Sequence, residues 1–396
     1  MSTTRSPVPD TLFLLILLLG GLGTAAHGAE TLTVGYLDLA DDPRYRDEYR
    51  EEELRGLPWG RPYAGAELAA REARFPLAAV GLALDLRHES AAGPEELPAR
   101  LAVLRQAGAA AVLVDLPGER LAALAADDLL LLNVSARDDA LRQTQCRANL
   151  LHLIPAEAMY QDALAQYLVA RKWRQVLVLQ GPAAADAARV ASFQRAAGRF
   201  GLKIVAVRPF VYGNDPRQRE QNNLALLTSG ADYDVLYIAD AGAEFAREAA
   251  YRGQLPRPLV GAEGLLAEAW HWAWERHGAP QLNKRFRKQT GRPMDDAAWA
   301  AWLGVKALAE AALRTQSRDP AQLAAYLRGA GLVLDGFKGY RLDFRSWDGQ
   351  LRQPLLLTSH NWVVERAPLE GFLHQSNNLD TLGFDRPDSR CRAGGG

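Results

Sequence analysis

The fold of this chain is decided by residues 175–211, which read QVLVLQGPAAADAARVASFQRAAGRFGLKIVAVRPFV. The runs 175–180 and 203–211 are rich in β-branched and other apolar residues, whereas the Ala- and Arg-rich segment 184–200 between them has helical spacing. Nearly continuous apolar strands separated by helices are typical of a parallel sheet that is covered on both faces. We therefore predict an α/β fold from this segment.

The same alternation extends in both directions along the chain. One α/β series precedes Asn149 and another follows it, and two such series predict two doubly wound parallel-sheet lobes with a cleft between them. The predicted strands are 31–37, 80–86, 110–115, 129–134, 175–180, 203–211, 235–239, 259–261, 338–344 and 355–365. The predicted helices are 64–75, 94–107, 121–127, 159–171, 184–200, 216–228, 243–251, 270–274, 280–289, 294–315 and 320–329.

Length, charge and missing motifs narrow the function. The 396 residues correspond to two domains, or three at most. The 46 Lys and Arg residues balance 47 Asp and Glu residues, so charge gives no reason to expect nucleic acid or an anionic membrane as a partner. The sequence contains no Walker motif, no Rossmann glycine fingerprint, no Gly-x-Ser-x-Gly elbow and no His-Glu-x-x-His. We therefore expect a binding protein rather than an enzyme, and no cofactor.

Residues 1–28 are predicted to be a secretory signal peptide. Arg5 precedes the apolar run 12–19, which is too short to cross a hydrocarbon core about 30 Å thick, and small residues follow through Ala29. A buried N-terminal helix is the alternative. No later stretch reaches roughly 18 consecutive apolar residues. We therefore expect a mature chain that starts at Ala29 or Glu30, is not inserted in a membrane and resides in the periplasm.

The chain has only two cysteines, Cys146 and Cys391, which are too few for a disulfide scaffold or a zinc knuckle. Because the predicted compartment is oxidising, we predict that they form a disulfide bond. This bond would tie the C-terminal tail to the junction between the two α/β series. Two unrelated buried thiols are the alternative.

The order of these features, together with several short motifs, resembles a known family. The motifs are the opening strand 33–37, the helix segment 65–69, the segment 286–293 that leads into an Ala-rich helix with Trp302, and the late strand 336–344. They resemble the type I periplasmic substrate-binding proteins of ABC transporters, in the branched-chain amino-acid branch. The resemblance covers about residues 32–364 and implies two lobes that are joined by a hinge.

The family fold also implies domain bounds. Residues 29–153 would form lobe 1, completed by about 262–340, and residues 154–261 would form lobe 2, completed by about 341–369. Residues 370–396 would form a C-terminal tail. Its motifs 371–374 and 379–387 are similar to a subgroup that accompanies periplasmic quinoprotein (PQQ-dependent) alcohol oxidation systems.

The resemblance also implies a set of ligand residues. In amino-acid-binding members, hydroxyl and amide groups of lobe 1 hold the ligand carboxylate, while an aromatic residue and an acid of lobe 2 hold its ammonium. The matching positions here are Ser135 and Ala136 in lobe 1, Asp240 and Glu263 in lobe 2, and Trp59 over the ligand. The alternatives are helix caps for the two acids and simple packing for the tryptophan.

Two departures from the family pattern change the expected ligand. The strand end 115–118 lacks the usual Ser or Thr and contains Pro117, which has no amide hydrogen. The second strand end adds the carboxylates of Asp138 and Asp139. These acids would repel a carboxylate ligand unless Arg137 turned inward. We therefore expect an acid-lined cleft that favours a positively charged ligand or a metal ion.

A metal site is a second possibility in the same cleft. Asp38 and Asp41 follow the first strand and could supply oxygen ligands to calcium or a lanthanide, together with Asp240 and Glu263. The spacing is not that of an EF-hand, and the acid-rich segment 38–53 is also typical of a solvated loop. Metal binding on the same fold is therefore an alternative.

The predicted function is that of the periplasmic solute-binding component of an ABC transporter. Its two lobes would close around a small molecule and deliver it to a permease in the inner membrane. The tail resemblance links this function to quinoprotein alcohol oxidation. The alternatives are a ligand sensor that signals to a membrane partner and, on scattered carboxylates alone, a hydrolase. The candidate ligands are an alcohol-oxidation product, the quinone cofactor, a metal and a modified amino acid.

Overall fold

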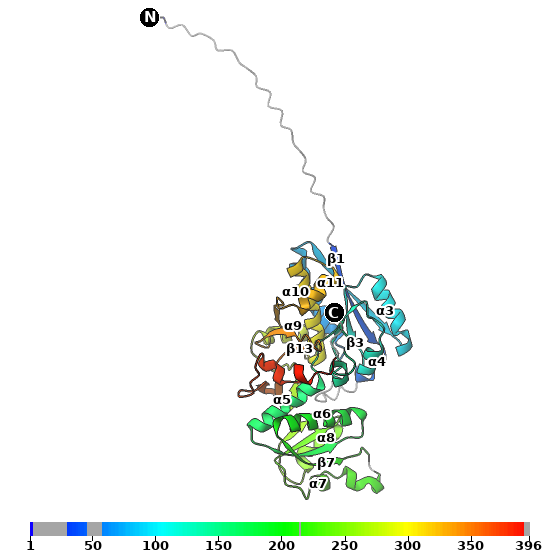
Figure 1. Ribbon diagram of the computed structural model, residues 1–396, viewed down its shortest axis with the longest axis vertical. Helices are drawn as coiled ribbons and strands as arrows, with labels where there is room; N and C mark the ends of the chain where they lie inside the picture. The colour runs from blue at the N-terminus through cyan, green and yellow to red at the C-terminus, as the bar shows by residue number, and fades with distance from the viewer. Residues whose placement is uncertain (3–29, 46–57, 214, 392–396) are drawn as a thin grey trace.

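The computed structural model describes residues 1–2, 30–45, 58–213 and 215–391. The predicted signal peptide therefore lies almost wholly outside the described residues, as does part of the acidic segment after the first strand. Figure 1 shows two lobes stacked along the long axis of the molecule, with the first strand in the upper lobe and the green segment in the lower one. Within the described residues, no helix combines the length and the apolar character needed to cross a membrane.

The upper lobe, lobe 1, is built on a five-stranded sheet with the strand order β2-β1-β3-β4-β5. All four strand pairs are parallel. The strand β3 is buried along its whole length, as expected for a strand with helices on both faces. The elements are β1 (Glu30–Leu39), α2 (Tyr63–Ala78), β2 (Leu82–Ala91), α3 (Leu97–Gln106), β3 (Ala111–Asp115), α4 (Gly118–Ala123), β4 (Leu130–Asn133) and β5 (Leu150–His152).

Helices from the last third of the chain complete lobe 1. The buried side chains of α9 (Ala279–Thr290), α10 (Asp296–Thr315) and α11 (Pro320–Arg328) share one hydrophobic core with β1 and α2. At the contact between α2 and α10, a Cβ atom on Gly65 would lie 2.0 Å from the carbonyl oxygen of Ala298. Only glycine lets these two helices approach so closely.

The lower lobe, lobe 2, is built on a four-stranded sheet with the order β7-β6-β8-β9, in which all pairs are also parallel. Its core is separate from that of lobe 1 and includes side chains of α5, α6, β6 and β8. The elements are α5 (Glu157–Ala170), β6 (Gln175–Gln180), α6 (Ala184–Phe200), β7 (Lys203–Pro209), α7 (Leu224–Leu227), β8 (Val235–Ala239), α8 (Glu244–Arg252) and β9 (Leu259–Gly261).

A third, antiparallel sheet with the order β10-β14-β15 joins the two lobes. On β14, Leu355 and Leu357 belong to the core of lobe 2, whereas Leu356 between them belongs to the core of lobe 1. Successive side chains of a strand point to opposite faces, so this strand contributes to both cores. The strands are β10 (Leu266–Glu268), β14 (Leu355–Ser359) and β15 (Trp362–Ala367), and the short strands β11 (Leu334–Asp335), β12 (Arg341–Phe344) and β13 (Leu351–Arg352) form a further antiparallel sheet.

The prediction of an α/β fold with two parallel-sheet lobes is confirmed, but several local predictions are wrong. The single strand predicted at 355–365 is two strands, because His360 and Asn361 form a turn between β14 and β15. The helix predicted at 216–228 is a 3-10 helix, Pro216–Asn222, followed by α7. The helix predicted at 121–127 is instead α4, which begins directly after Pro117.

The tryptophan-rich run at 270–274 is also not a helix. It forms a loop in which Trp270 and Trp274 are buried in the core of lobe 1. Their indole N–H groups donate to the side chain of Asn283 at 2.9 Å and to the carbonyl oxygen of Phe337 at 3.0 Å. Tertiary packing, rather than local helix propensity, therefore sets the conformation of this run.

Candidate functional site

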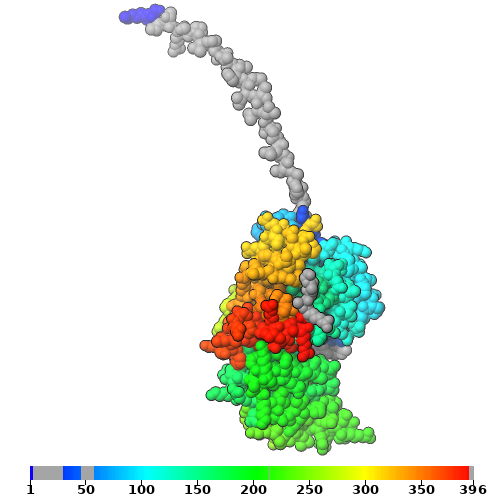
Figure 2. Space-filling view, viewed as in Figure 1, coloured from blue at the N-terminus to red at the C-terminus, as the bar shows by residue number. Residues whose placement is uncertain are grey.

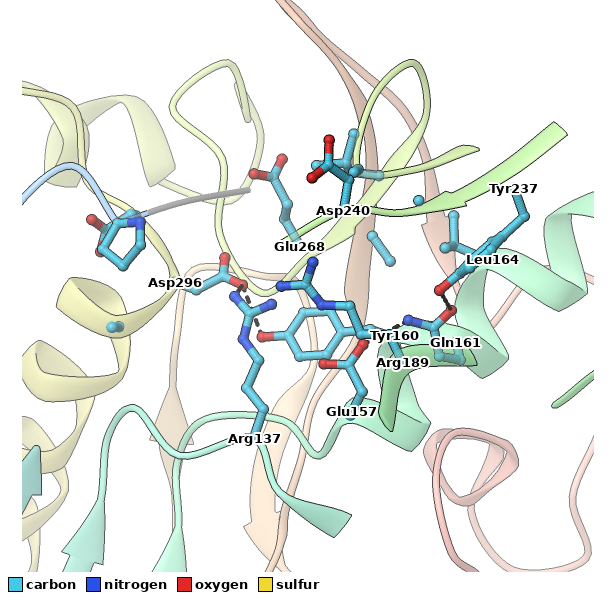
Figure 3. Close-up of a pocket in the computed structure, with 17 residues that line it drawn as sticks. Arg137, Glu157, Tyr160, Gln161, Leu164, Arg189, Tyr237, Asp240, Glu268 and Asp296 are labelled. Carbon is cyan, nitrogen blue, oxygen red and sulfur yellow. Dashed lines mark hydrogen bonds and ion pairs between the residues drawn. The ribbon is translucent and has the colours of Figure 1, made fainter. Parts of the chain in front are cut away.

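A cavity of about 90 Å³ lies between the two lobes. Its lining includes Asp240 and Ala262, which directly follow β8 and β9, and Arg137 and Glu157, which come four and five residues after β4 and β5. The cavity therefore lies at the carboxyl ends of parallel strands of both sheets. Figure 3 shows the labelled polar side chains converging on it from both lobes. The lining residues are Pro58, Arg137, Glu157, Tyr160, Gln161, Leu164, Arg189, Tyr237, Asp240, Gly261, Ala262, Leu266, Ala267, Glu268, Asp295, Asp296 and Ala297.

Asp296, in the first turn of α10, connects the two lobes at this cavity. One of its carboxylate oxygens accepts hydrogen bonds from the guanidinium of Arg137 at 3.0 Å and from the hydroxyl of Tyr160 on α5 at 2.8 Å. The other oxygen accepts from the backbone N–H of Trp270 at 2.8 Å. The carboxylate thus has a donor on each oxygen and fixes the positions of the side chains around it.

Arg137 points into the cleft, against the edge of lobe 2. Its guanidinium carbon lies 4.3 Å from the centre of the Tyr160 ring, a distance typical of a cation–π contact. Burial opposes its charge, but the neighbouring Tyr160 and Asp296 raise the pKa of the guanidinium above its ordinary value. Arg137 therefore carries a fixed positive charge at the cavity wall.

A second set of polar groups on lobe 2 is held by a chain of hydrogen bonds. The hydroxyl of Tyr237 donates to the amide oxygen of Gln161 at 3.0 Å, and the amide nitrogen of Gln161 donates to Glu157 at 2.6 Å. The ring of Tyr237 is stacked on Phe193 with centres 4.1 Å apart, and burial raises the pKa of its phenol. Tyr237 therefore acts as a neutral donor. The two hydrogen bonds orient the Glu157 carboxylate at the first turn of α5.

Arg189 of α6 is the other cation in the lining. Figure 3 shows its side chain extending toward the middle of the pocket, alongside Tyr160. Within the described part of the chain, its guanidinium takes part in no hydrogen bond and no ion pair. Its five N–H donors are therefore unmatched by other described groups of the protein.

Among the sequence-predicted ligand residues, Asp240 is the one that lines the cavity. It is 1% exposed, and both of its oxygens already have donors. The backbone N–H of Ala246 in α8 donates to one oxygen at 2.9 Å, and the N–H of Gly242 at 3.2 Å and the hydroxyl of Tyr212 donate to the other. In this arrangement, Asp240 stabilises the start of α8, the role that the sequence left open as its alternative.

The other four predicted ligand residues lie outside the lining. Three of them form hydrogen bonds with other groups of the protein. The N–H of Trp59 donates to Asp295 at 3.0 Å, the N–H of Ala136 donates to Asn133 at 2.9 Å, and a carboxylate oxygen of Glu263 accepts from the N–H of Gly264 at 2.9 Å.

The fourth, Ser135, lies in a network of charged groups at the edge of lobe 1. Its hydroxyl accepts a hydrogen bond from Arg44 at 2.9 Å, and the same guanidinium pairs with Asp42 at 2.6 Å and Asp115 at 3.0 Å. The hydroxyl of Tyr45 also donates to Asp115 at 2.6 Å. Burial raises the pKa of Asp115, and the charge of Arg44 partly opposes this rise. The backbone N–H groups of Ser135 and Ala136 both donate to the Asn133 side chain, at 3.2 and 2.9 Å, so these two donors are already used within the protein.

The predicted metal residues do not come together with the cavity lining. Asp38 is 1% exposed and lies 3.1 Å from His88 and 3.3 Å from Arg61, whereas Asp41 is exposed. Burial would raise the pKa of Asp38, but hydrogen bonds from His88 and Ser90 hold it below its ordinary value. The described residues contain no group of three or more His, Cys, Asp or Glu side chains placed to bind a metal ion. The acids of 46–53 lie outside the described residues.

The predicted disulfide bond is confirmed. Cys146, which precedes β5, is joined to Cys391 of the tail, with Cα atoms 5.5 Å apart. The described residues contain no free cysteine.

Sequence reasoning missed most of the cavity. Glu157, Tyr160, Gln161 and Arg189 lie on helices that were predicted or nearly so, but nothing in the sequence distinguishes them from the other polar residues of α5 and α6. The signal that could have been used is position, because each lies in the first turns of a helix that follows a parallel strand, where ligands bind in α/β folds.

Comparison with known proteins gives relatives by fold. No family model matches the chain, and no curated protein matches it in sequence. The solved structure of an ABC transporter substrate-binding protein from Sphaerobacter thermophilus is 16% identical with a TM-score of 0.68, over 90% of this chain and 100% of that one. A branched-chain amino acid ABC transporter periplasmic ligand-binding protein from Burkholderia xenovorans is 15% identical with a TM-score of 0.63, over 82% and 89%.

A third structure, an ABC transporter substrate-binding protein from Desulfitobacterium hafniense in complex with Leu, is 19% identical with a TM-score of 0.61, over 85% of this chain and 100% of that one. At these identities the likeness shows the fold. The two parallel-sheet lobes match the fold of type I periplasmic binding proteins, and the solved structures with this fold include a protein of the branched-chain amino acid type.

Proposed function

We propose that this protein is the periplasmic solute-binding component of an ABC transporter, which captures a small molecule between its lobes and delivers it to a permease. The observation that carries this proposal is the cavity between the lobes, which is lined from both sheets by polar side chains with fixed orientations. Such a site can recognise a solute and can respond to it by a change in lobe separation.

The mechanism is hinge closure. Among the described residues, direct polar contacts between the lobes include Tyr160 with Asp296 at the cavity, and Ser192 of α6 with Asp139, the latter at 3.1 Å. A ligand that contacts Arg137 on one lobe and Arg189 on the other would add interactions that exist only in the closed state. Such differential contacts shift the equilibrium toward closure.

The proposed activity is binding without covalent chemistry. Proteins of similar structure are described as ligand- or substrate-binding proteins, and one of them holds Leu. The sequence-predicted residues Trp59, Ser135, Ala136, Asp240 and Glu263 stay a proposed ligand set. Binding to the cavity would favour Asp240 among them, whereas binding at the edge of lobe 1 would favour Ser135.

The location and the finer links of this function also stay predictions. The signal peptide predicted at 1–28 supports a periplasmic location, and the tail motifs 371–374 and 379–387 support a link to quinoprotein alcohol oxidation. Genes for a permease and an ATPase beside this gene would favour transport, whereas a kinase gene would favour the sensor. Calcium or lanthanide binding at Asp38 and Asp41 remains the alternative on the same fold.

The test of solute binding is native mass spectrometry of protein purified from its own periplasm. We expect a bound small molecule that is released on denaturation, and small-angle X-ray scattering should show a smaller radius of gyration with that molecule than without it. A ligand-free protein whose radius of gyration is unaffected by the periplasmic small-molecule extract would contradict the proposed function.

A further inference from the structure

We propose that the cleft takes a small organic anion and that Arg189 holds the negative group of this solute. The inference rests on the proposed function, because it names the class of solute for the same cleft. It differs from the expectation drawn from the sequence, which was a positively charged ligand in an acid-lined cleft.

The number of acids in the cleft is a poor guide to its polarity. The lining contains five acidic residues and only two arginines. However, both oxygens of each of the three aspartates already accept hydrogen bonds from the protein. The two glutamates also have donors, because Glu157 accepts from Gln161 and Glu268 accepts from Thr358. Each of these hydrogen bonds uses part of the acceptor capacity of a carboxylate, so a cation at the cavity would share the oxygens with the protein's own donors.

The two arginines of the lining differ, because Arg137 pairs with Asp296 at 3.0 Å, whereas Arg189 pairs with none of these acids in the described part of the chain. Arg189 shares α6 with Arg195 and Arg199, which both pair with the buried carboxylate of Asp162, at 2.6 and 2.8 Å. Arg189 has no such partner in the described part of the chain, although its side chain reaches the cavity. A guanidinium offers a planar fork of donors that matches a carboxylate, so the unmatched donors of Arg189 fit an anionic group.

The size of the cavity limits the solute. A volume of about 90 Å³ has room for roughly six to nine water-sized groups. This corresponds to a carboxylate with a few carbon atoms and is too small for a multi-ring quinone cofactor. The rings of Tyr160 and Tyr237 provide apolar surface for the carbon chain.

The experiment is calorimetry with three probes that share one carbon chain: butyrate, 1-butanol and butylamine. We expect butyrate to bind and the other two to bind at least tenfold more weakly. The variant Arg189→Gln should lower the affinity for butyrate about tenfold or more, because it removes a charged hydrogen-bond partner. The control variant Arg120→Gln changes an arginine on the surface of lobe 1 and should leave the affinity unchanged.

The outcomes separate the two proposals. The anion assignment is wrong if butylamine binds as tightly as butyrate. It is also wrong if wild type and Arg189→Gln bind butyrate with equal affinity. Either result leaves the proposed solute binding unaffected. A periplasmic ligand that proves neutral or cationic overturns it as well. If neither butyrate nor a periplasmic small molecule binds, both proposals fail.

A second inference concerns the tail and stands on different contacts. We propose that residues 369–391, the strap, hold the two lobes together across the hinge and limit how far they open. Figure 2 shows the C-terminal segment as a red band lying directly over the boundary between the green lobe 2 and the rest of the molecule.

The first part of the strap is attached to lobe 2. The N–H of Leu369 donates to Gln166 of α5 at 3.0 Å, and the ring of Phe372 packs edge-on against Phe200 of α6. Farther along the strap, the side chain of Leu382 is also fully buried in the core of lobe 2. Through these contacts, the strap packs against α5 and α6 and contributes to the core of lobe 2.

The middle of the strap binds both lobes within a few residues. Asp380 accepts hydrogen bonds at 2.8 Å from Arg352 and from Arg345, which directly follows β12. The buried side chains of Leu342 and Phe344 on β12 belong to the core of lobe 1. Three residues later, the N–H of Gly383 donates at 2.7 Å to Asp162 of α5 in lobe 2. Three residues span at most about 10 Å. The lobes therefore cannot separate by much at this point without breaking one of these buried contacts.

The end of the strap is fixed covalently to lobe 1. The disulfide joins Cys391 to Cys146, and the N–H of Arg390 donates to Gln143 at 3.2 Å. A tether of this kind keeps a non-covalent contact at high effective concentration, so the Asp380 contacts re-form quickly when they open. Loss of the disulfide should therefore loosen the middle of the strap as well as its end.

The strap is tested without any ligand, by scattering and hydrogen exchange on the oxidised protein and on protein reduced with tris(2-carboxyethyl)phosphine. We expect reduction to increase the radius of gyration and to speed amide exchange of Gly383 about tenfold or more. Cys391→Ser should reproduce both effects, and Asp380→Asn should reproduce them with the disulfide intact. Circular dichroism checks that each protein remains folded.

Equal radii of gyration and equal exchange at Gly383 in the oxidised and reduced proteins would overturn the strap. If Cys391→Ser fails to fold, reduction of the folded wild-type protein supplies the same measurement. Because no solute is present, this outcome does not depend on the proposed function.

Discussion

The two edges of the cleft differ in whether an arginine has partners within the protein. On the edge of lobe 1, the guanidinium of Arg44 forms ion pairs with Asp42 and Asp115 and donates a hydrogen bond to Ser135. On the edge of lobe 2, Arg189 reaches the cavity without such partners in the described chain. A buried and fully partnered charge contributes to structure, whereas an unmatched charge at a cavity is available to a ligand. We therefore expect Arg44 to stabilise lobe 1 and Arg189 to be available to a ligand.

The largest effect should come from breaking the network of lobe 1. Arg44→Gln leaves the carboxylates of Asp42 and Asp115, which are 5% and 0% exposed, without their cation. We expect a loss of about 3 to 5 kcal/mol in the free energy of unfolding, measured by urea denaturation. Arg189→Gln should change the same free energy by less than about 0.5 kcal/mol.

The exposed pair of Arg87 and Asp85 provides the matched control for this experiment. Arg87→Gln should cost no more than about 1 kcal/mol, since exposed ion pairs contribute little. If Arg44→Gln is no more destabilising than Arg87→Gln, the difference between the two edges of the cleft is not real.

A second prediction concerns the pH dependence of lobe 1. His152 of β5 is 1% exposed and contacts Asn133, the residue that holds the Ser135–Ala136 backbone. Burial and the charge of Arg142 lower the pKa of His152 well below its ordinary value. The unfolded chain therefore binds more protons than the folded protein below about pH 6.5. The contribution of neutral His152 to stability is present above about pH 6.5 and is lost as the pH falls.

When the pH falls from 7 to 5, protonation of His152 in the unfolded chain should lower the free energy of unfolding by about 2 kcal/mol. His152→Gln should remove it, so that the difference in stability between the two pH values becomes smaller. The exposed His360 is the control, because His360→Gln should leave the pH dependence as it is. An unchanged pH dependence in His152→Gln would show that this histidine is not held neutral in the fold.

The smallest predicted effect is at the contact between the two edges. Tyr160→Phe removes the hydroxyl that donates to Asp296 at 2.8 Å while keeping the ring over Arg137. We expect a loss of about 1 kcal/mol in the free energy of unfolding. The exposed Tyr340 serves as the reference, and equal effects of Tyr160→Phe and Tyr340→Phe would show that the link between the lobes contributes nothing to stability.

The strands and helices that depend on local pattern were predictable. The helix 184–200 and the strands 175–180, 235–239 and 259–261 have the predicted bounds, because buried parallel strands carry continuous apolar runs and their helices carry a different period. The run 355–365 was not divided correctly, because two strands of one hairpin share the same apolar pattern and only the turn at His360 separates them.

Only a small part of the candidate site was predictable from the sequence. The sequence located Asp240 at the end of β8, where it does line the cavity, and it identified Arg137 as the residue that could turn inward. It could not show that the oxygens of Asp240 are used by Ala246 and Tyr212, because these partners depend on how α8 and its neighbours pack.

The sequence by itself determined the α/β class, the two parallel-sheet lobes and the pairing of Cys146 with Cys391. The first two follow from periodicity, and the pairing was predicted from the presence of only two cysteines in a chain expected to be exported to an oxidising compartment. Only the tertiary structure decided the polarity of the cleft, because polarity depends on which charges already have partners. Arg44 and Arg189 look alike in the sequence, and only the packing of the two lobes uses the donors of one and leaves those of the other facing the cavity.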